Sequence, residues 1–186
     1  MSTSRRTLPR DGDVDLLLAL LVIAPHGDVR APQPPARTPA VITCSASVAP
    51  TVVLGAPAML VVEFRNGGKE TVAVLNWGTP FEEAWLQPFV DVARDGTPLA
   101  YGGAMVKRGD PERDEYFALA AGQRRSARID LAEVFDLRAP GRYVVTPRLV
   151  LHDVAPASAR LPRTRAAHAG MPLKCAPVEF RVVTGK

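Results

Sequence analysis

Proline is the residue that most limits what this chain can fold into. The 186-residue chain holds 18 prolines, and many of them separate short apolar runs. Because proline removes a backbone donor and breaks a helix interior, this distribution favours short strands over long helices. Eight segments are strand-like, at near-regular spacing with turn residues between them: 41–48, 58–66, 71–77, 88–96, 97–106, 124–131, 141–153 and 177–183. Such spacing predicts an all-β, immunoglobulin-like antiparallel β-sandwich of seven or eight strands.

Glycine-containing turns indicate which neighbouring strands pair. The Asn-Gly-Gly turn at 66–68 predicts a hairpin between 58–66 and 71–77. The Asp-Gly turn at 95–96 predicts a second hairpin, in which 97–106 pairs back on the strand before the turn.

Helical signals are sparse. The segment 110–122 is compatible with one short helix whose first turn is acidic, and 131–137 with a single turn between two strands. Tyr143 follows a Pro-Gly pair, where many sandwiches place a tyrosine at the start of a late strand.

The N-terminal region has the pattern of an export signal. Three arginines within the first ten residues precede nine apolar residues, LLLALLVIA, at 16–24. A run of this length fits a signal peptide and is too short to span a bilayer, so we expect a signal peptide over 1–24 and a periplasmic or secreted protein. Acidic residues within 11–15 interrupt the pattern, which leaves a partly apolar tail as the alternative. The five prolines of 25–40 predict an extended linker, and the β-sandwich domain is expected over 41–186.

The distribution of charge argues against nucleic-acid binding. The sequence pI is about 9.4, yet residues 41–154 carry 12 basic and 14 acidic side chains. The basic excess lies in 155–175, which holds four basic residues and no acidic one. Because no stripe of basic and aromatic residues emerges, a nucleic-acid partner is not expected. We interpret 155–175 as a long exposed basic loop before the last strand.

The two cysteines, Cys44 and Cys175, lie near opposite ends of the predicted domain. Neither belongs to a Cys-x-x-Cys pair, so a cysteine zinc site is not expected. In or beside the first and last strands of a sandwich they can lie close together. Export therefore predicts a disulfide between them, and two buried thiols are the alternative.

Residues with the spacing of a catalytic or metal site are scarce. The three histidines are His26, His152 and His168, and the sequence contains neither HExxH nor GxSxG. A metal site made by His152, Asp153 and His168 is the minor alternative to solvent-facing histidines. The acidic residues of 110–115 lack the residue order of a calcium loop, and we interpret them as a solvent-exposed part of the surface. We expect no enzyme activity, no metal and no cofactor.

Two surfaces are candidates for binding a protein partner. The stretch LNWGTPFEEAW at 75–85 brings Trp77 and Trp85 into a polar context, beside Glu82 and Glu83. These tryptophans either seal one end of the core or form an aromatic patch with the two glutamates as a polar rim. The second surface is the basic loop, with four cations that would steer an acidic partner: Arg160, Arg163, Arg165 and Lys174.

Three stretches together resemble a known family. They are VEFRNGGKETVAVLNWGTPFE (62–82), PFVDVARDGTPLAYGGAMVKRGDPERDEYFALAAGQ (88–123) and IDLAEVFDLRAPGRYVV (129–145). In their spaced elements, including the W-G-T-P and R-D-G turns and the closing G-x-Y, they are similar to the non-catalytic β-rich domain that precedes the protease domain of deuterolysin-like (aspzincin) metallopeptidases. The likeness covers roughly 45–150.

The family's catalytic HExxH and GTxxDxxYG motifs do not occur in the sequence. No catalytic or zinc residue is therefore carried over, and the resemblance implies a related pro- or accessory domain standing alone. The expected role is that of an exported, non-enzymatic, protein-binding sandwich: an inhibitor, chaperone or accessory module for a deuterolysin-like metallopeptidase. The alternative is a structural or envelope-associated sandwich with no protease partner.

Overall fold

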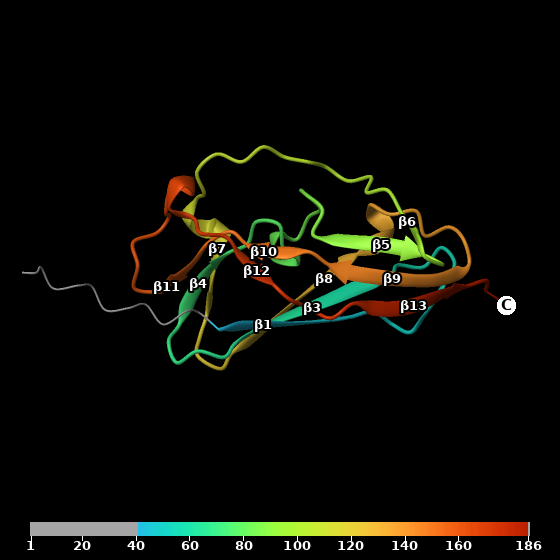
Figure 1. Cartoon of the computed structure of the whole chain (residues 1–186), viewed down its shortest axis with the longest axis horizontal. Coiled ribbons are helices and arrows are strands. Elements are labelled where there is room, and N and C mark those ends of the chain that lie inside the picture. Colours follow the sequence, from blue (N-terminus) through green and yellow to red (C-terminus); the bar gives the residue numbers. More distant parts are fainter. Residues whose placement is uncertain (1–40, 186) are drawn as a thin grey trace, which may run out of the picture. The chain divides into compact units, whose positions relative to one another are not determined.

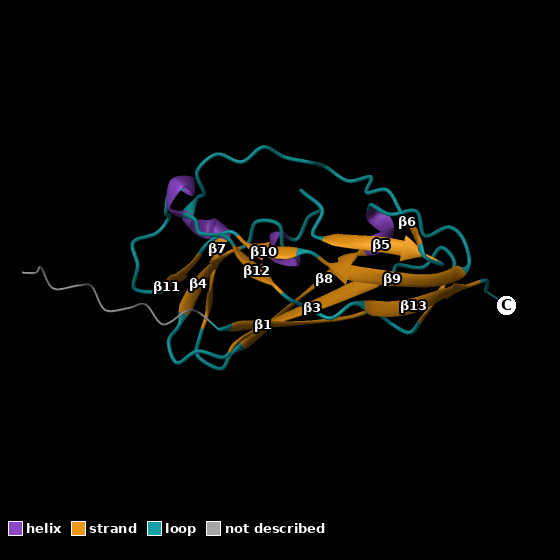
Figure 2. Ribbon diagram, in the orientation of Figure 1, coloured by secondary structure: helices purple, strands orange, loops and turns teal. Residues whose placement is uncertain are grey.

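The computed structural model describes residues 41–185, and these residues form short strands joined by loops and four 3-10 turns (Figures 1 and 2). The predicted signal peptide and linker lie outside the described residues. None of the helical turns within 41–185 has the length and apolar character of a membrane span.

The strands are named in chain order: β1 (Ile42–Ser47), β2 (Thr51–Val53), β3 (Met59–Asn66), β4 (Val72–Leu75), β5 (Val90–Arg94), β6 (Thr97–Pro98), β7 (Tyr116–Leu119), β8 (Arg124–Asp130), β9 (Gly141–Pro147), β10 (Leu149–Leu151), β11 (Val154–Pro156), β12 (Met171–Leu173) and β13 (Val178–Val183). The 3-10 turns are η1 (Pro80–Glu82), η2 (Arg113–Glu115), η3 (Leu131–Glu133) and η4 (Arg165–Ala167).

Most of these strands pair antiparallel, in four hydrogen-bonded sets. The larger two have the strand orders β1-β3-β8 and β2-β13-β9-β5-β6, and the smaller two are β11-β4-β7 and β10-β12. Within the described residues only β2 and β13 pair in parallel. The predicted all-β, immunoglobulin-like sandwich is confirmed, although its strands are shorter and more numerous than the seven or eight expected.

The core follows from the two-residue period of the strands. Along β3, Leu60, Val62 and Phe64 are buried on one face while intervening side chains are partly exposed. They belong to one apolar cluster with Tyr143 of β9 and Phe180 of β13, whose rings stack at 5.1 Å between centroids.

Tyr143 closes one corner of the sandwich. Its hydroxyl donates to the carbonyl of Ala139 at 2.7 Å, four residues upstream, while its ring is fully buried. This is the tyrosine corner of immunoglobulin-like sandwiches, at the position that the sequence indicates.

The predicted hairpin between 58–66 and 71–77 is wrong. Strand β3 pairs with β1 and β8, whereas β4 pairs with β7 and β11. Asn66 explains the difference, because its buried amide donates to the carbonyls of Glu70 and Leu119 at 2.8 and 2.9 Å. The Asn66 side chain thus fixes a connection between two sheets instead of closing a two-strand turn.

The second predicted hairpin is present but short. Asp95 and Gly96 both have positive φ, at 48° and 85°, and join β5 to β6. Beyond Pro98 the chain leaves the ladder, so the expected strand over 97–106 is wrong for most of its length. Residues 99–112 instead form a long loop, here called the strap, which runs across the top of Figure 1.

Two other expectations fail where strand pairing overrides local pattern. The helix expected over 110–122 is limited to the three residues of η2, because β7 follows at once and pairs with β4. The segment 155–175 is not one uninterrupted loop, since β11 pairs with β4 and β12 with β10. The turn expected within 131–137 is present as η3.

The predicted disulfide is confirmed. Cys44 of β1 is bonded to Cys175, which precedes β13, and their Cα atoms are 5.0 Å apart. The bond joins residues 131 positions apart in the chain. It therefore ties the first strand to the segment that enters the last one.

The double substitution Cys44→Ser/Cys175→Ser is expected to lower the free energy of unfolding by about 4 kcal/mol, since the bond closes a loop of more than about 100 residues. Urea unfolding of the oxidised protein and of the variant measures the difference. The reduced wild-type protein is the control and should unfold like the variant. Equal midpoints for all three proteins would contradict a stabilising role for the bond.

Candidate functional site

A hollow of about 550 Å³ lies where three loops meet at one end of the sandwich. One loop follows β4, the second is the strap, and the third lies between β10 and β12. We call it the basic pocket, because all of its ionisable lining residues are basic. Its lining residues are Trp77, Gln87, Val106, Lys107, Arg108, His152, Arg165 and His168.

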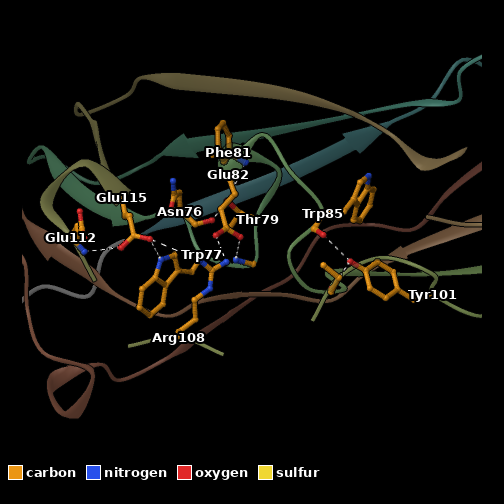
Figure 3. A network of polar contacts seen from close by, with 12 residues as sticks. Asn76, Trp77, Thr79, Phe81, Glu82, Trp85, Tyr101, Arg108, Glu112 and Glu115 are labelled. Atoms are coloured by element: carbon orange, nitrogen blue, oxygen red, sulfur yellow. Dashed lines mark hydrogen bonds and ion pairs between the residues drawn. The ribbon is translucent and has the colours of Figure 1, made fainter. Parts of the chain in front are cut away.

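Trp77 forms part of the wall of this pocket and is held from two sides. Its indole N–H donates to Oε1 of Glu115 at 2.7 Å, and the Arg108 guanidinium lies over its ring, 5.1 Å from the centroid (Figure 3). The other Glu115 oxygen accepts from the backbone N–H of Glu112 at 2.7 Å, so η2 fixes the carboxylate. The side chain of Trp77 is only 4% exposed.

The sequence Gly-Thr-Pro after Trp77 determines where Glu82 lies. Thr79 caps η1 by accepting from the N–H of Phe81, and Pro80 occupies the first position of the turn, where its missing donor is not needed. This turn directs Glu82 back to the N–H of Gly78, which donates to Oε2 at 2.8 Å. Gly78 has a φ of 63°, and a Cβ there would lie against the amide of Gln87.

Glu82 and Arg108 form a largely buried ion pair behind the pocket wall. Oε1 of Glu82 accepts from Nη2 of Arg108, and the side chains are 5% and 18% exposed. Burial raises the pKa of the Glu82 carboxyl above its ordinary value, and the Gly78 N–H and Arg108 oppose that rise. The pair attaches the strap to the turn at η1.

Trp85 lies apart from Trp77, in the apolar core (Figure 3). Its ring stacks on Phe89 at 4.5 Å and its N–H donates to the carbonyl of Asp130 at 2.9 Å. With 6% of its surface exposed, Trp85 offers little area to a partner. Both indoles therefore act as structural clasps, and the aromatic patch considered from the sequence is not exposed. Of its proposed polar rim, the Glu82 side chain is only 5% exposed, whereas Glu83 is exposed.

A second buried carboxylate anchors the segment between β11 and β12. Asp153 is 2% exposed and accepts from Arg163 Nη2 at 2.7 Å and from the Tyr116 hydroxyl at 2.9 Å. Burial, together with the hydrogen bond to Asp153, raises the pKa of Tyr116 to about 12. His168 completes the cluster, with its Nε2 at 3.2 Å from the carbonyl of Arg163.

The four basic residues singled out from the sequence separate into two groups. Arg163 is committed to Asp153, and Arg165 donates from Nη1 to the carbonyl of Arg108 at 2.6 Å, which joins its segment to the strap. Arg160 and Lys174 are exposed, and neither forms an ion pair with another residue of 41–185. Only Arg165 of the four lines the basic pocket.

Sequence reasoning missed the cations that the strap contributes. Arg108 lies 57 residues before Arg165 in the chain, with Lys107 next to it, and nothing local indicates that they meet. The local sequence gives one signal in the strap. The Lys-Arg pair is followed by Gly109 and Pro111, which favour a change of chain direction. His152 and His168 both line the pocket, but no group of three or more His, Cys, Asp or Glu residues within 41–185 could hold a metal ion.

Comparison with known proteins finds a relative over part of the chain. No known family model matches the chain. The chain is 36% identical over 90 residues to an extracellular protease of Aeromonas hydrophila, a match that covers 48% of this chain and 25% of that protease. The chain thus matches about a quarter of its relative's length. An extracellular relative and a disulfide are both consistent with a secreted or periplasmic protein.

Likeness to solved structures is distant. The CARDB domain of a Pyrococcus furiosus protein has a TM-score of 0.34 at 11% identity, covering 77% of this chain and 89% of that one. A β-glucosidase from Listeria innocua has a TM-score of 0.33 at 14% identity, covering 80% of this chain and 17% of that one.

Replacing Arg108 with methionine is expected to lower the free energy of unfolding by about 3 kcal/mol, because it leaves the buried Glu82 carboxylate without its cation. Urea unfolding followed by tryptophan fluorescence measures the loss. The double variant Arg108→Met/Glu82→Gln is the matched control and should recover part of it, since no unpaired charge remains. A single variant as stable as the wild type would contradict the structural role of the pair.

His152 is expected to make folding weaken as the pH falls. Burial, then the nearby His168, Arg108 and Arg165, lowers the pKa of His152 below its ordinary value of 6.5. The folded state therefore disfavours protonation of His152. The stability contributed by neutral His152 is present above about pH 6.5 and is lost as the pH falls through the lowered pKa.

In the variant His152→Gln, thermal unfolding should depend less on pH between about pH 7.5 and pH 5.5 than in the wild type. Arg160→Gln removes an exposed cation elsewhere and should leave the pH dependence unchanged. The same slope in the His152 variant and in the wild type would contradict this assignment.

Proposed function

We propose that the chain is an exported, non-enzymatic accessory domain that binds the catalytic domain of a deuterolysin-like metallopeptidase. The observation that carries the proposal is the 36% identity over 90 residues to an extracellular protease, of which only 25% is matched. A match of that extent fits a β-rich domain that accompanies a protease. The β-domain fold and the sequence without HExxH support a role other than catalysis.

The surface charge suggests how such a domain would approach its partner. The buried indoles leave little aromatic surface to anchor a protein. Exposed cations remain at the basic pocket and at Arg160 and Lys174. Exposed charges of one sign accelerate association with an oppositely charged surface more than they strengthen the final complex. The proposed partner therefore presents an acidic surface next to its cleft.

The test measures binding of the full chain to the catalytic domain of a deuterolysin-like metallopeptidase, made inactive by replacing the glutamate of its HExxH motif. Surface plasmon resonance should detect a complex at micromolar concentrations. Its association rate should fall as the salt concentration rises from about 0.05 to about 0.5 M, because the screening length shortens from more than about 10 Å to less than about 8 Å.

The basic segment is tested with point substitutions. Deleting residues 157–170 would also remove Arg163, which pairs with the buried Asp153. Arg160→Gln/Lys174→Gln should slow association about two- to tenfold and leave the thermal midpoint unchanged. A zinc peptidase of a different family is the control for non-specific attraction. No complex at about 10 µM, or equal binding of both peptidases, would favour a structural or envelope-associated sandwich instead.

A further inference from the structure

We propose that the basic pocket is a binding site for a carboxylate of an acidic peptide. The site would take a glutamate or aspartate side chain, or a chain terminus, that lies next to an apolar residue. That the peptide belongs to a metallopeptidase rests on the proposed function. The ligand chemistry itself rests on the pocket alone.

Cations line the basic pocket, and the nearby carboxylates are bonded to other groups. Lys107, Arg108 and Arg165 line it, together with two histidines, and no carboxylate does. The nearby acids are already engaged: Glu82 with Arg108 and the N–H of Gly78, and Glu115 with the Trp77 indole. Outside the lining, Asp110 accepts from the backbone N–H of Arg165 at 2.9 Å and Asp153 is paired with Arg163.

Several donors on the lining are free to bind a ligand. Within 41–185, the ammonium of Lys107, the amide of Gln87 and the ring of His152 have no hydrogen-bonding partner. The Arg165 guanidinium uses Nη1 for the carbonyl of Arg108 and forms no ion pair with a residue of 41–185. An ammonium, a guanidinium and a neutral amide around one hollow are the donors that a carboxylate accepts from.

The strap is held in position before any ligand binds. The N–H of Val106 donates to the carbonyl of Leu86 at 3.0 Å on one side. On the other side Arg165 bonds the carbonyl of Arg108, and Arg108 is paired with Glu82. A site assembled in advance loses less conformational entropy on binding, so few contacts are enough for specific recognition.

Apolar surface at the edge of the pocket favours a peptide over a small inorganic anion. Val106 lines the hollow and Met105, next to it, is among the most exposed large apolar side chains of the described residues. A residue that follows the bound carboxylate could cover this surface with an apolar side chain. Phenylalanine next to glutamate is therefore the first sequence to test.

Acidification should strengthen binding, because a proton on His152 adds a positive charge to the lining. The groups facing His152 are His168, Arg108 and Arg165, and Lys107 lines the same hollow. Burial and, after it, repulsion from His168, Arg108 and Arg165 lower the pKa of His152, and a bound carboxylate would offset the repulsion. Its neighbour Asp153 is buried against Arg163 and is not available for this purpose.

The test uses the full chain and a fluorescein-labelled heptapeptide, Gly-Ser-Glu-Glu-Phe-Gly-Ser with an amidated end. Fluorescence anisotropy at about 0.05 M salt should show that replacing both glutamates with glutamine weakens binding at least tenfold. A third peptide, Gly-Ser-Gln-Gln-Phe with a free terminal carboxylate, separates the two sources of the carboxylate. If either peptide that carries a carboxylate binds more tightly than the amidated glutamine peptide, the site is supported. If the amidated glutamine peptide binds as tightly as the other two, the proposal is overturned.

Two double variants with the same loss of charge locate the site. Lys107→Gln/Arg165→Gln should weaken binding of the glutamate peptide about tenfold, and Arg160→Gln/Lys174→Gln should leave it unchanged. The single variant Lys107→Glu alters a side chain with no partner within 41–185, so its fold should persist and its binding should be lost. Equal losses in both double variants would mean diffuse charge attraction and overturn the proposal.

The pH dependence adds an independent readout. Binding should tighten between about pH 8 and pH 6 in the wild type and not in His152→Gln, and pH-independent wild-type binding would overturn the assignment. The peptide result and the protease result are separable. A peptide that does not bind while the catalytic domain does would overturn this site only, and the reverse result would overturn the proposed function and leave the site.

Discussion

Burial of carboxylates decides the arrangement of this end of the sandwich. Glu82 and Asp153 are both almost fully buried, and an unpaired buried carboxylate would cost several kcal/mol. Each acid is matched by an arginine from a different loop: Arg108 for Glu82 and Arg163 for Asp153. Because these cations come from segments without regular structure, the two pairs hold the strap and the segment after β11 against the sheets. The basic pocket is the space left between the loops thus held.

The rest of the domain provides a rigid base for these loops. One apolar cluster joins the larger sheets, the Tyr143 hydroxyl closes a corner, and the bond between Cys44 and Cys175 ties the first strand to the segment that enters the last one. Loops that carry recognition residues on a rigid sandwich are a common solution in binding proteins. Both tryptophans have a structural role here: Trp85 packs in the core and Trp77 forms part of the wall of the pocket. Their burial leaves little aromatic surface exposed at this end of the domain.

The basic pocket is suited to attract an anion, because cations line it and no carboxylate does. The similarity to a quarter of an extracellular protease and the disulfide agree with an accessory domain outside the cytoplasm. In such a domain, the cations that are exposed to solvent determine which partner is attracted.

The sequence by itself determined the features that depend on neighbours along the chain. Strand-like runs marked β1, β3, β5 and β9, the Asp-Gly turn marked the link from β5 to β6, and the position of Tyr143 indicated the corner. Only the tertiary structure decided which strands pair, as Asn66 shows by bonding across to Leu119 instead of closing a hairpin. The same holds for the pocket. Lys107, Arg108 and Arg165 meet because Arg108 pairs with the buried Glu82 and Arg165 donates to the carbonyl of Arg108, and no local pattern records these contacts.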